Sequence, residues 1–255
     1  MPSGPRFDPV TLEVLWTRLI STVDEAAAAL VRTSFSTVVR ESNDFACVLT
    51  DARGYSLVQA TDSIPSFIGT VPRTIRAFLQ EYPPQSLSPG DIVATNDIWL
   101  GTGHLPDITL AKPIFLDGML VGFAGSVAHA PDIGGRIRSA DSREVFEEGL
   151  QIPPLKVVHA GRPDETFMRL LRKNVRVPDQ VVGDLFAQFA ALDLMERQVL
   201  ALMHEHRLGD LAALAEEIQG RSEQAMRSAI REVPDGVYAQ EMVTDGFEQP
   251  IRLKL

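Results

Sequence analysis

The sequence predicts an α+β fold in which mixed and antiparallel β-hairpins carry a metal site and pack against long helices. Three observations support this prediction. Two pairs of short apolar runs are each joined by a turn-forming segment, which is typical of hairpins. Longer segments repeat apolar residues at three- and four-residue spacing, which is typical of helices with one buried face. The pattern His-x-Pro-Asp occurs twice, at residues 104–107 and 129–132, on either side of one hairpin.

Composition and charge narrow the class of protein. The 255 residues can form one large domain or two small ones, and 45% apolar with 23% charged residues is ordinary for a globular chain. A formal net charge of −10 argues against general nucleic-acid or anionic-membrane binding. Cys47 is the only cysteine, which excludes an internal disulfide and a cysteine-based zinc site. Without a secretory signal pattern or an apolar run near the ~18 residues of a membrane span, we expect a cytoplasmic protein.

Two helices are expected in the first third of the chain. Residues 8–34 form the first, because Asp8 is suited to cap it and Pro9 to occupy its first position. Its apolar residues recur on one face, as in a core or oligomer-interface helix. A shorter helix is expected over residues 73–81, ended by the segment Tyr82-Pro-Pro.

Short strands are expected around these helices. Residues 45–50 and 55–60 alternate as in a hairpin, and residues 92–95 form another strand. Asp44 precedes the first strand, where a carboxylate is commonly solvated or caps a turn. Cys47 lies within that strand and is predicted to be a small buried apolar residue.

The second hairpin joins residues 108–115 to residues 119–128. Asp117-Gly118 between them suits a type I′ turn, whose two central residues need positive φ. If that turn sets the register, His104 faces Pro131 and His129 faces Pro106. The two His-x-Pro-Asp patterns then meet at the open end of the hairpin.

Two imidazoles and two carboxylates have the composition of a divalent metal site. Such ligands suit zinc, manganese and iron(II), and the absence of thiolates disfavours a purely structural zinc. The alternative is that each His and Asp satisfies local turn amides. In a regular strand Asp107 points away from the face that His104 and His129 share. Either one Asp then stays behind the ligands, or bends at the prolines bring both within reach.

The rest of the chain is mainly helical. Helices are expected from Asp164 to about residue 174, from Pro178 with a long apolar stripe, and from Asp210 to about residue 232. Strands follow over residues 237–243 and 251–255, the last without a partner, so we expect the polypeptide or a partner to continue there. The expected regions are 1–160 with the metal site, 161–233 of helices, and 234–255 as the start of a further β region.

Five ordered motifs resemble the hydantoinase B/oxoprolinase family. They are ND-x-x-x-G-x-x-HLPD, AHAPDIGG, EEGLQIPPLK, NVRVPDQVVGDLFAQFAA and PDGVY. The resemblance covers nearly the whole chain. This family includes B subunits of ATP-dependent N-methylhydantoinases, the corresponding half of 5-oxoprolinase, and large subunits of acetone and acetophenone carboxylases. Its members generally continue well past residue 255, so the chain resembles their amino-terminal part or a shortened version.

The resemblance implies a set of site residues. His104, Asp107 and His129 are the implied metal ligands, and Asp44 is a candidate fourth ligand or catalytic carboxylate. Asp132 is implied as the catalytic group behind them, which orients an imidazole or takes a proton. The metal would be Mn, Zn or Fe. ATP would be bound by a separate hydantoinase A/oxoprolinase-type ATPase subunit, in agreement with the lack of a Walker A motif in this sequence.

The implied function is that of a B-type subunit of an ATP-dependent amidohydrolase acting on a hydantoin, 5-oxoproline or another lactam. The alternatives are a subunit of an ATP-dependent ketone carboxylase or a non-catalytic scaffolding subunit. An oligomer with the ATPase subunit is expected. Residues 96–99, 101–104 and 136–141 depart from the family pattern and flank the implied metal ligands, so the substrate itself is not carried over.

Overall fold

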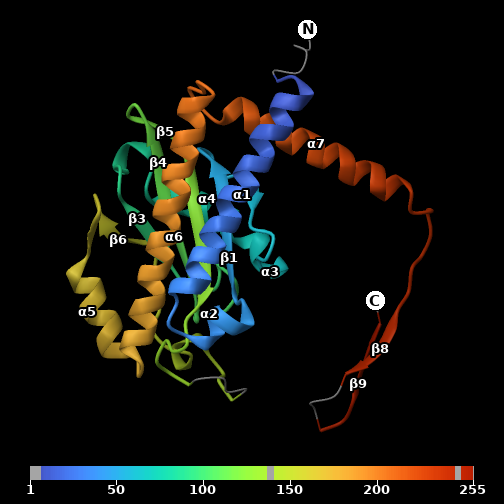
Figure 1. The fold of residues 1–255 in the computed structure, drawn as a ribbon. Coiled ribbons are helices and arrows are strands. Elements are labelled where there is room, and N and C mark those ends of the chain that lie inside the picture. The colour runs from blue at the N-terminus through green and yellow to red at the C-terminus, as the bar shows by residue number, and fades with distance from the viewer. Residues whose placement is uncertain (1–6, 137–140, 245–247, 255) are drawn as a thin grey trace. The chain divides into compact units, whose positions relative to one another are not determined.

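The computed structural model describes residues 7–136, 141–244 and 248–254. Contacts between residues divide the chain into two compact units, Met1–Gln219 and Gly220–Leu255. The first unit contains a seven-stranded sheet with helices on both faces (Figure 1). The predicted α+β class is therefore confirmed.

The sheet is built around the β4–β5 hairpin. In spatial order its strands are β2 (Ser56–Gln59), β1 (Phe45–Asp51), β5 (Met119–His129), β4 (Asp107–Leu116), β3 (Ile92–Thr95), β6 (Leu155–His159) and β7 (Arg162–Pro163). Every strand pairing among the described residues is antiparallel, so the parallel pairings that a mixed sheet would contain do not occur there. Nearly all β4 residues and most β5 residues are buried, because helices cover both faces at the centre of the sheet.

Helices form a layer on each side. The α-helices of the first unit are α1 (Pro9–Thr33), α2 (Thr37–Ser42), α3 (Pro65–Ile68), α4 (Thr70–Glu81), α5 (Glu165–Asn174), α6 (Pro178–Glu205) and the beginning of α7 (Ala212–Arg231), with short 3-10 helices at Pro84–Ser86 and Val145–Glu147. Asp8 caps α1 by accepting hydrogen bonds from the backbone N–H groups of Val10 and Thr11, as expected. The α1 and α6 helices lie side by side across one face of the sheet (Figure 1).

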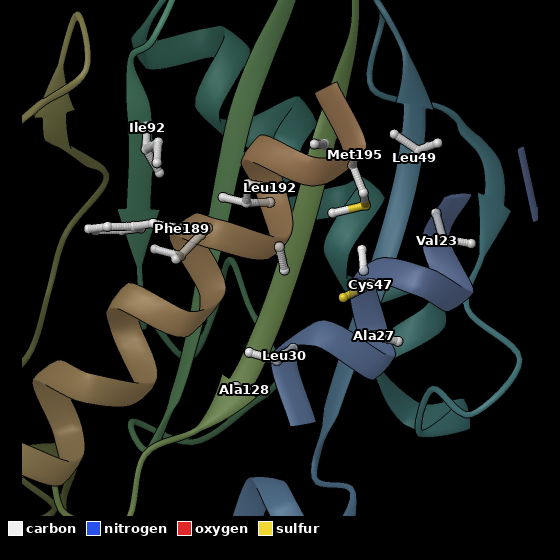
Figure 2. Close-up of a cluster of buried hydrophobic side chains, with 14 of the residues drawn as sticks. Val23, Ala27, Leu30, Cys47, Leu49, Ile92, Ala128, Phe189, Leu192 and Met195 are labelled. Carbon is white, nitrogen blue, oxygen red and sulfur yellow. The ribbon is translucent and has the colours of Figure 1, made fainter. Parts of the chain in front are cut away.

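The main core lies between this helix pair and the sheet. Leu30 of α1, Leu192 of α6 and Leu49 of β1 are among its buried side chains (Figure 2). Cys47 is fully buried in the same core, and burial raises the pKa of its thiol to about 12, in agreement with the role of a small apolar residue. On the opposite face, α4 covers a smaller core that includes Ile75 and Phe123.

The division of the chain differs from the one expected from the sequence. The expected boundary at residues 160/161 separates the sheet from the helices. In the structure, Leu192 and Met195 of α6 share one core with the strands, so the helices belong to the same compact unit. Burial of an apolar stripe against a sheet is the usual reason that such helices do not stand alone.

The second unit contains the end of α7 and a two-stranded hairpin. Strand β8 (Glu241–Thr244) pairs with β9 (Ile251–Lys254), so the last strand has the partner that the sequence did not reveal. Residue 255, expected as the end of that strand, lies outside the described residues. Among the helices that the structure describes, none combines the length and apolarity needed to cross a bilayer.

Candidate metal centre

The register of the β4–β5 hairpin places His129 opposite Asp107. Asp117 and Gly118 have positive φ angles of 50° and 81°, as the type I′ turn requires, and Leu116 pairs with Met119 as predicted. The register then shifts by one residue beyond Ile114. The predicted pairing of His129 with Pro106 is therefore wrong.

A β-bulge causes this shift. Ile114 pairs with Gly122 and Phe115 pairs with Leu120, which leaves Val121 as the extra residue on β5. Since a one-residue shift moves side chains to the other face, the obstacle predicted for a regular hairpin disappears. Directly opposed residues of antiparallel strands share a face, so Asp107 and His129 now point to the same side.

Asp44 reaches the same end of the sheet from the next strand. Phe45 pairs with Ala128, and the His129 backbone N–H donates to the Asp44 carbonyl oxygen at 3.0 Å. His104 lies in the loop before β4, outside the strand pairing, so its predicted pairing with Pro131 does not form. Three adjacent strands and one loop therefore bring the four predicted ligands to one place.

Asp107 is the centre of the cluster. Its Oδ2 lies 2.8 Å from His104 Nε2, and its Oδ1 lies 3.0 Å from His129 Nδ1. One ligand atom from each of the three side chains lies within 4.8 Å of the other two. Asp44 Oδ2 is 3.7 Å from His129 Nδ1, at the border of this three-residue group. The assignment of all four as metal ligands remains a prediction.

The electrostatics of the cluster suit a cation. Burial alone would raise the pKa of the Asp107 carboxyl, but hydrogen bonds from His104 and His129 outweigh it and lower that pKa to about 2. The hydrogen bond with Asp107 raises the pKa of His104. Burial raises the pKa of Asp44. A buried ionised carboxylate between two imidazoles is a donor set that fits Zn, Mn or Fe(II).

The structure places Asp132 in the loop that follows β5. Its Oδ1 accepts hydrogen bonds at 2.9 Å from Gly134 N and from Arg176 Nη1, and its Oδ2 accepts one from Arg176 N. The carboxylate is buried and anchors this loop to the segment before α6. These contacts hold the loop and do not reach an imidazole, so the catalytic role of Asp132 remains a prediction.

Two glycine-containing loops form one wall of the site. Arg136 N donates to Glu147 O and Leu150 N donates to Ile133 O, each at 2.8 Å. Gly149, at φ +143°, faces the Ile133 carbonyl oxygen, which would lie 2.4 Å from an added Cβ. The AHAPDIGG and EEGLQIPPLK segments are therefore adjacent, and the absence of a side chain at Gly149 allows their backbones to touch. Residues 137–140 of the segment that departs from the family pattern lie outside the described residues.

The side chain of Asn96 links these two loops to the loop that carries His104. Its buried side-chain amide donates to the carbonyl oxygens of Leu105 and Leu150, and its Oδ1 accepts from Ile152 N. Asn96 thus joins the segment that carries His104 to the segment after Glu148. The sequence signals for this role were the position of Asn96 after a predicted strand and its place at the start of the ND-x-x-x-G-x-x-HLPD motif.

Two cavities border the cluster. The first, of about 320 Å³, is lined by His104, His129, apolar residues of the 130–133 loop, Ser142 and Glu148. The second, of about 350 Å³, is lined by Asp44, Asp107, Phe67 and Thr102. Sequence reasoning did not identify Ser142 or Glu148 as site residues, because only the pairing of the two loops brings them beside the histidines.

Comparisons with known proteins agree with this architecture. The family model described as Hydantoinase B/oxoprolinase matches residues 8–255. The chain is 33% identical over 248 residues to a Pseudomonas sp. (strain NS671) protein whose name describes a B-type subunit of a D-/L-hydantoinase, covering 95% of this chain and 42% of that protein. It is 30% identical over 248 residues to 5-oxoprolinase 1 of Arabidopsis thaliana, covering 91% of this chain and 19% of that protein.

A solved structure shows the same fold. The crystal structure of ATP-dependent caprolactamase from Pseudomonas jessenii matches with a TM-score of 0.86 and 29% identity, over 94% of this chain and 42% of that chain. The present chain thus spans less than half the length of each relative.

Proposed function

This chain belongs to the hydantoinase B/oxoprolinase family, and from that premise we propose that it is the metal-binding part of a B-type subunit in an ATP-dependent amidohydrolase. The proposed substrate is a cyclic amide or imide of the hydantoin, 5-oxoproline or lactam type. The observation that carries the proposal is the cluster of His104, Asp107 and His129 beside a cavity of about 320 Å³. Relatives named for hydantoin, oxoproline and caprolactam hydrolysis favour this reaction over ketone carboxylation.

The cluster residues would hold one divalent ion, either Mn, Zn or Fe, with Asp44 as the candidate fourth ligand. When bound, such an ion polarises an amide carbonyl or the water that attacks it. Because its pKa is about 2, the Asp107 carboxyl is ionised at neutral pH and can serve as a negatively charged metal ligand. The two imidazoles complete a set that leaves positions open for water and substrate.

The cavity beside the cluster would hold the ring. Its volume lies at the lower end of the ~300–1,000 Å³ typical of small-molecule sites, which suits a compact substrate. Pro106, Pro131 and Ile133 give it an apolar side that would exclude water from part of the ring. Asp132 keeps this side in place through its bonds to Arg176 and Gly134.

The proposed partner is an A-type ATPase subunit that binds ATP and activates the substrate. A relative whose name describes one component of a hydantoinase supports an enzyme of more than one chain. The proposal includes a cytoplasmic hetero-oligomer, since ATP is available in that compartment.

Turnover by the co-expressed complex tests this function. The chain and its A-type partner would be supplied with ATP, Mn²⁺ and either hydantoin, 5-oxoproline or caprolactam. We expect ring opening that needs ATP and does not need bicarbonate. Consumption of acetone only when bicarbonate is present would instead establish a carboxylase, and a complex that turns over none of these compounds would support a scaffolding subunit.

A further inference from the structure

We propose that Glu148 is the proton-transfer residue of this site, which takes a proton from the attacking water and returns it to the leaving ring nitrogen. This inference rests on the proposed function as a cyclic amidohydrolase. It assigns to Glu148 a role for which Asp132 was the sequence-based candidate.

The position of Glu148 supports this role. It lines the same cavity as His104 and His129, on the wall formed by the second glycine-containing loop. It is half-buried, and among the described residues its carboxylate makes no hydrogen bond or salt bridge, although its charge interacts with the His104 imidazole. The adjacent Glu147 differs, because its carboxylate accepts a hydrogen bond from Arg143 N and pairs with Arg136 at 3.7 Å.

The backbone around Glu148 is held on both sides. Glu148 N donates to Val145 O at 3.1 Å, and Leu150 N donates to Ile133 O. Asn96 binds the Leu150 carbonyl oxygen from a third direction at 2.9 Å. A proton-transfer group needs such support, because its reach to the substrate depends on a fixed backbone.

A second observation is compatible with a polar ligand in this cavity. Ser142 lines it, and the Ser142 hydroxyl oxygen is buried without a hydrogen-bond partner among the described residues. An unsatisfied buried hydroxyl costs free energy, which a bound polar group would recover. The carbonyl or N–H group of a cyclic amide is such a partner.

The other carboxylates near this cavity are committed elsewhere. The Asp107 carboxylate is hydrogen-bonded to both imidazoles, and the Asp132 carboxylate is hydrogen-bonded to Arg176 and Gly134. Asp44 lines the second cavity. Among the described residues that line the first cavity, Glu148 is therefore the carboxylate that is available to exchange a proton with a ligand.

The proposed step is balanced within the site. One O–H bond of the attacking water breaks and its proton moves to the Glu148 carboxylate as the water oxygen bonds to the amide carbon, and the π electron pair of the C=O bond moves onto the carbonyl oxygen. That pair then reforms the C=O bond as the C–N bond breaks, the C–N electron pair stays on nitrogen, and the proton on Glu148 moves to that nitrogen. Glu148 returns to its initial state and one water is added to the ring, while activation by ATP belongs to the partner subunit.

Replacement of the carboxylate by its amide tests the proposal. Glu148→Gln keeps the size of the side chain but accepts no proton. In the metal-loaded complex with the A-type partner, we expect kcat for the best of the three cyclic amides to fall by about 10²–10⁴-fold, the usual contribution of a general acid–base. KM, metal content and melting temperature should stay near their wild-type values. Glu148→Ala should regain part of its activity when formate is added, because formate can replace the missing carboxylate.

The matched control is Glu144→Gln, which changes an exposed carboxylate in the same loop and should leave turnover unchanged. An active wild-type complex with an equally active Glu148→Gln variant would overturn this proposal alone. Loss of metal in parallel with activity would also overturn it, because Glu148 would then be a ligand. Absence of turnover by the wild-type complex would overturn the proposed function and this inference together.

Discussion

Two clusters of charged side chains lie on strand β4, on opposite faces of the sheet. Asp107 begins the strand and joins His104 and His129 in the candidate metal centre. Lys112 points toward α6, where its ammonium group pairs with Asp193 and, at 2.6 Å, with Glu196. Both clusters place buried charge on one strand, and their surroundings distinguish them.

The two clusters differ in their solvent exposure and in whether a cavity lies beside the charged groups. The Lys112 side chain is 8% exposed and is satisfied by two carboxylates. The His104 side chain is 48% exposed, and two cavities border the candidate metal centre. A buried charge whose partners all come from the protein serves to fix two elements together, whereas one beside a cavity can exchange its partner for a ligand.

The largest expected effect concerns the metal, and its absence would contradict the distinction between the two clusters. We expect the purified chain to carry about one Mn, Zn or Fe ion, since three neutral or anionic ligands favour one such ion. His104→Ala and His129→Ala should each lose most of it, as measured by elemental analysis. His204→Ala, at an exposed position on α6, is the control and should keep its metal. Full occupancy in both cluster variants would show that the metal binds elsewhere.

The second effect concerns stability. Lys112→Ala should lower the free energy of unfolding by about 2 kcal/mol, because it removes the buried ammonium group that pairs with the half-buried Glu196 carboxylate. Lys112→Met should recover part of that loss through packing against α6. Chemical denaturation would measure both variants, and their metal content should equal that of the wild type. Loss of metal in either one would contradict the separation of the two clusters.

The third effect is an opposite pH dependence of the two clusters. The Asp107 pKa is lowered from 3.8 to about 2, so in metal-free protein its stabilising contribution is present above pH 4 and is lost as the pH falls toward 2. Burial alone would lower the pKa of Lys112, but its two carboxylate partners outweigh it and raise that pKa. Its contribution is therefore present below pH 10.5 and is lost at more alkaline pH.

Denaturation midpoints measured across pH would show this contrast. Asp107→Asn should flatten the acid part of the profile alone, and Lys112→Met the alkaline part alone. A change in the same part of the profile for both variants would mean that the two clusters are coupled.

The smallest effect is expected at Asp132. Its bonds go to Arg176 and Gly134, so Asp132→Asn should change metal affinity by less than about tenfold, the lower end of the range for residues that orient metal ligands. Arg176→Met should have the same effect, since it removes the partner in the same contact. Metal titrations of both variants would test this, and a much larger loss in Asp132→Asn alone would indicate a direct role at the metal.

The sequence predicted much of this architecture because its signals are local. The Asp8 cap, the strand Ile92–Thr95 and the Asp117-Gly118 turn each depend on a few neighbouring residues, and the structure has all three. The candidate ligands were also identified, since the repeated His-x-Pro-Asp pattern and the family resemblance both mark them.

What the sequence did not reveal depends on distant contacts. Gly122, next to Val121, is a weak signal for a bulge, because a glycine inside a strand can also fit regular pairing, so the register error followed from a correct turn. The roles of Glu148 and Ser142 arise only when two loops pair through backbone atoms. The order of seven strands likewise results from pairings between distant segments, such as β3 with β6.

The single unpaired residue at Val121 also has a consequence for comparing relatives. About 26 Å of strand, at ~3.3 Å per residue, separates it from His129, yet the number of residues between the turn and His129 decides on which side of the sheet the imidazole emerges. A one-residue deletion near the turn would thus displace a candidate ligand that it does not touch. Sequence alignments of this family should therefore treat a gap in that hairpin as a change in the candidate metal centre, even where every histidine and aspartate is retained.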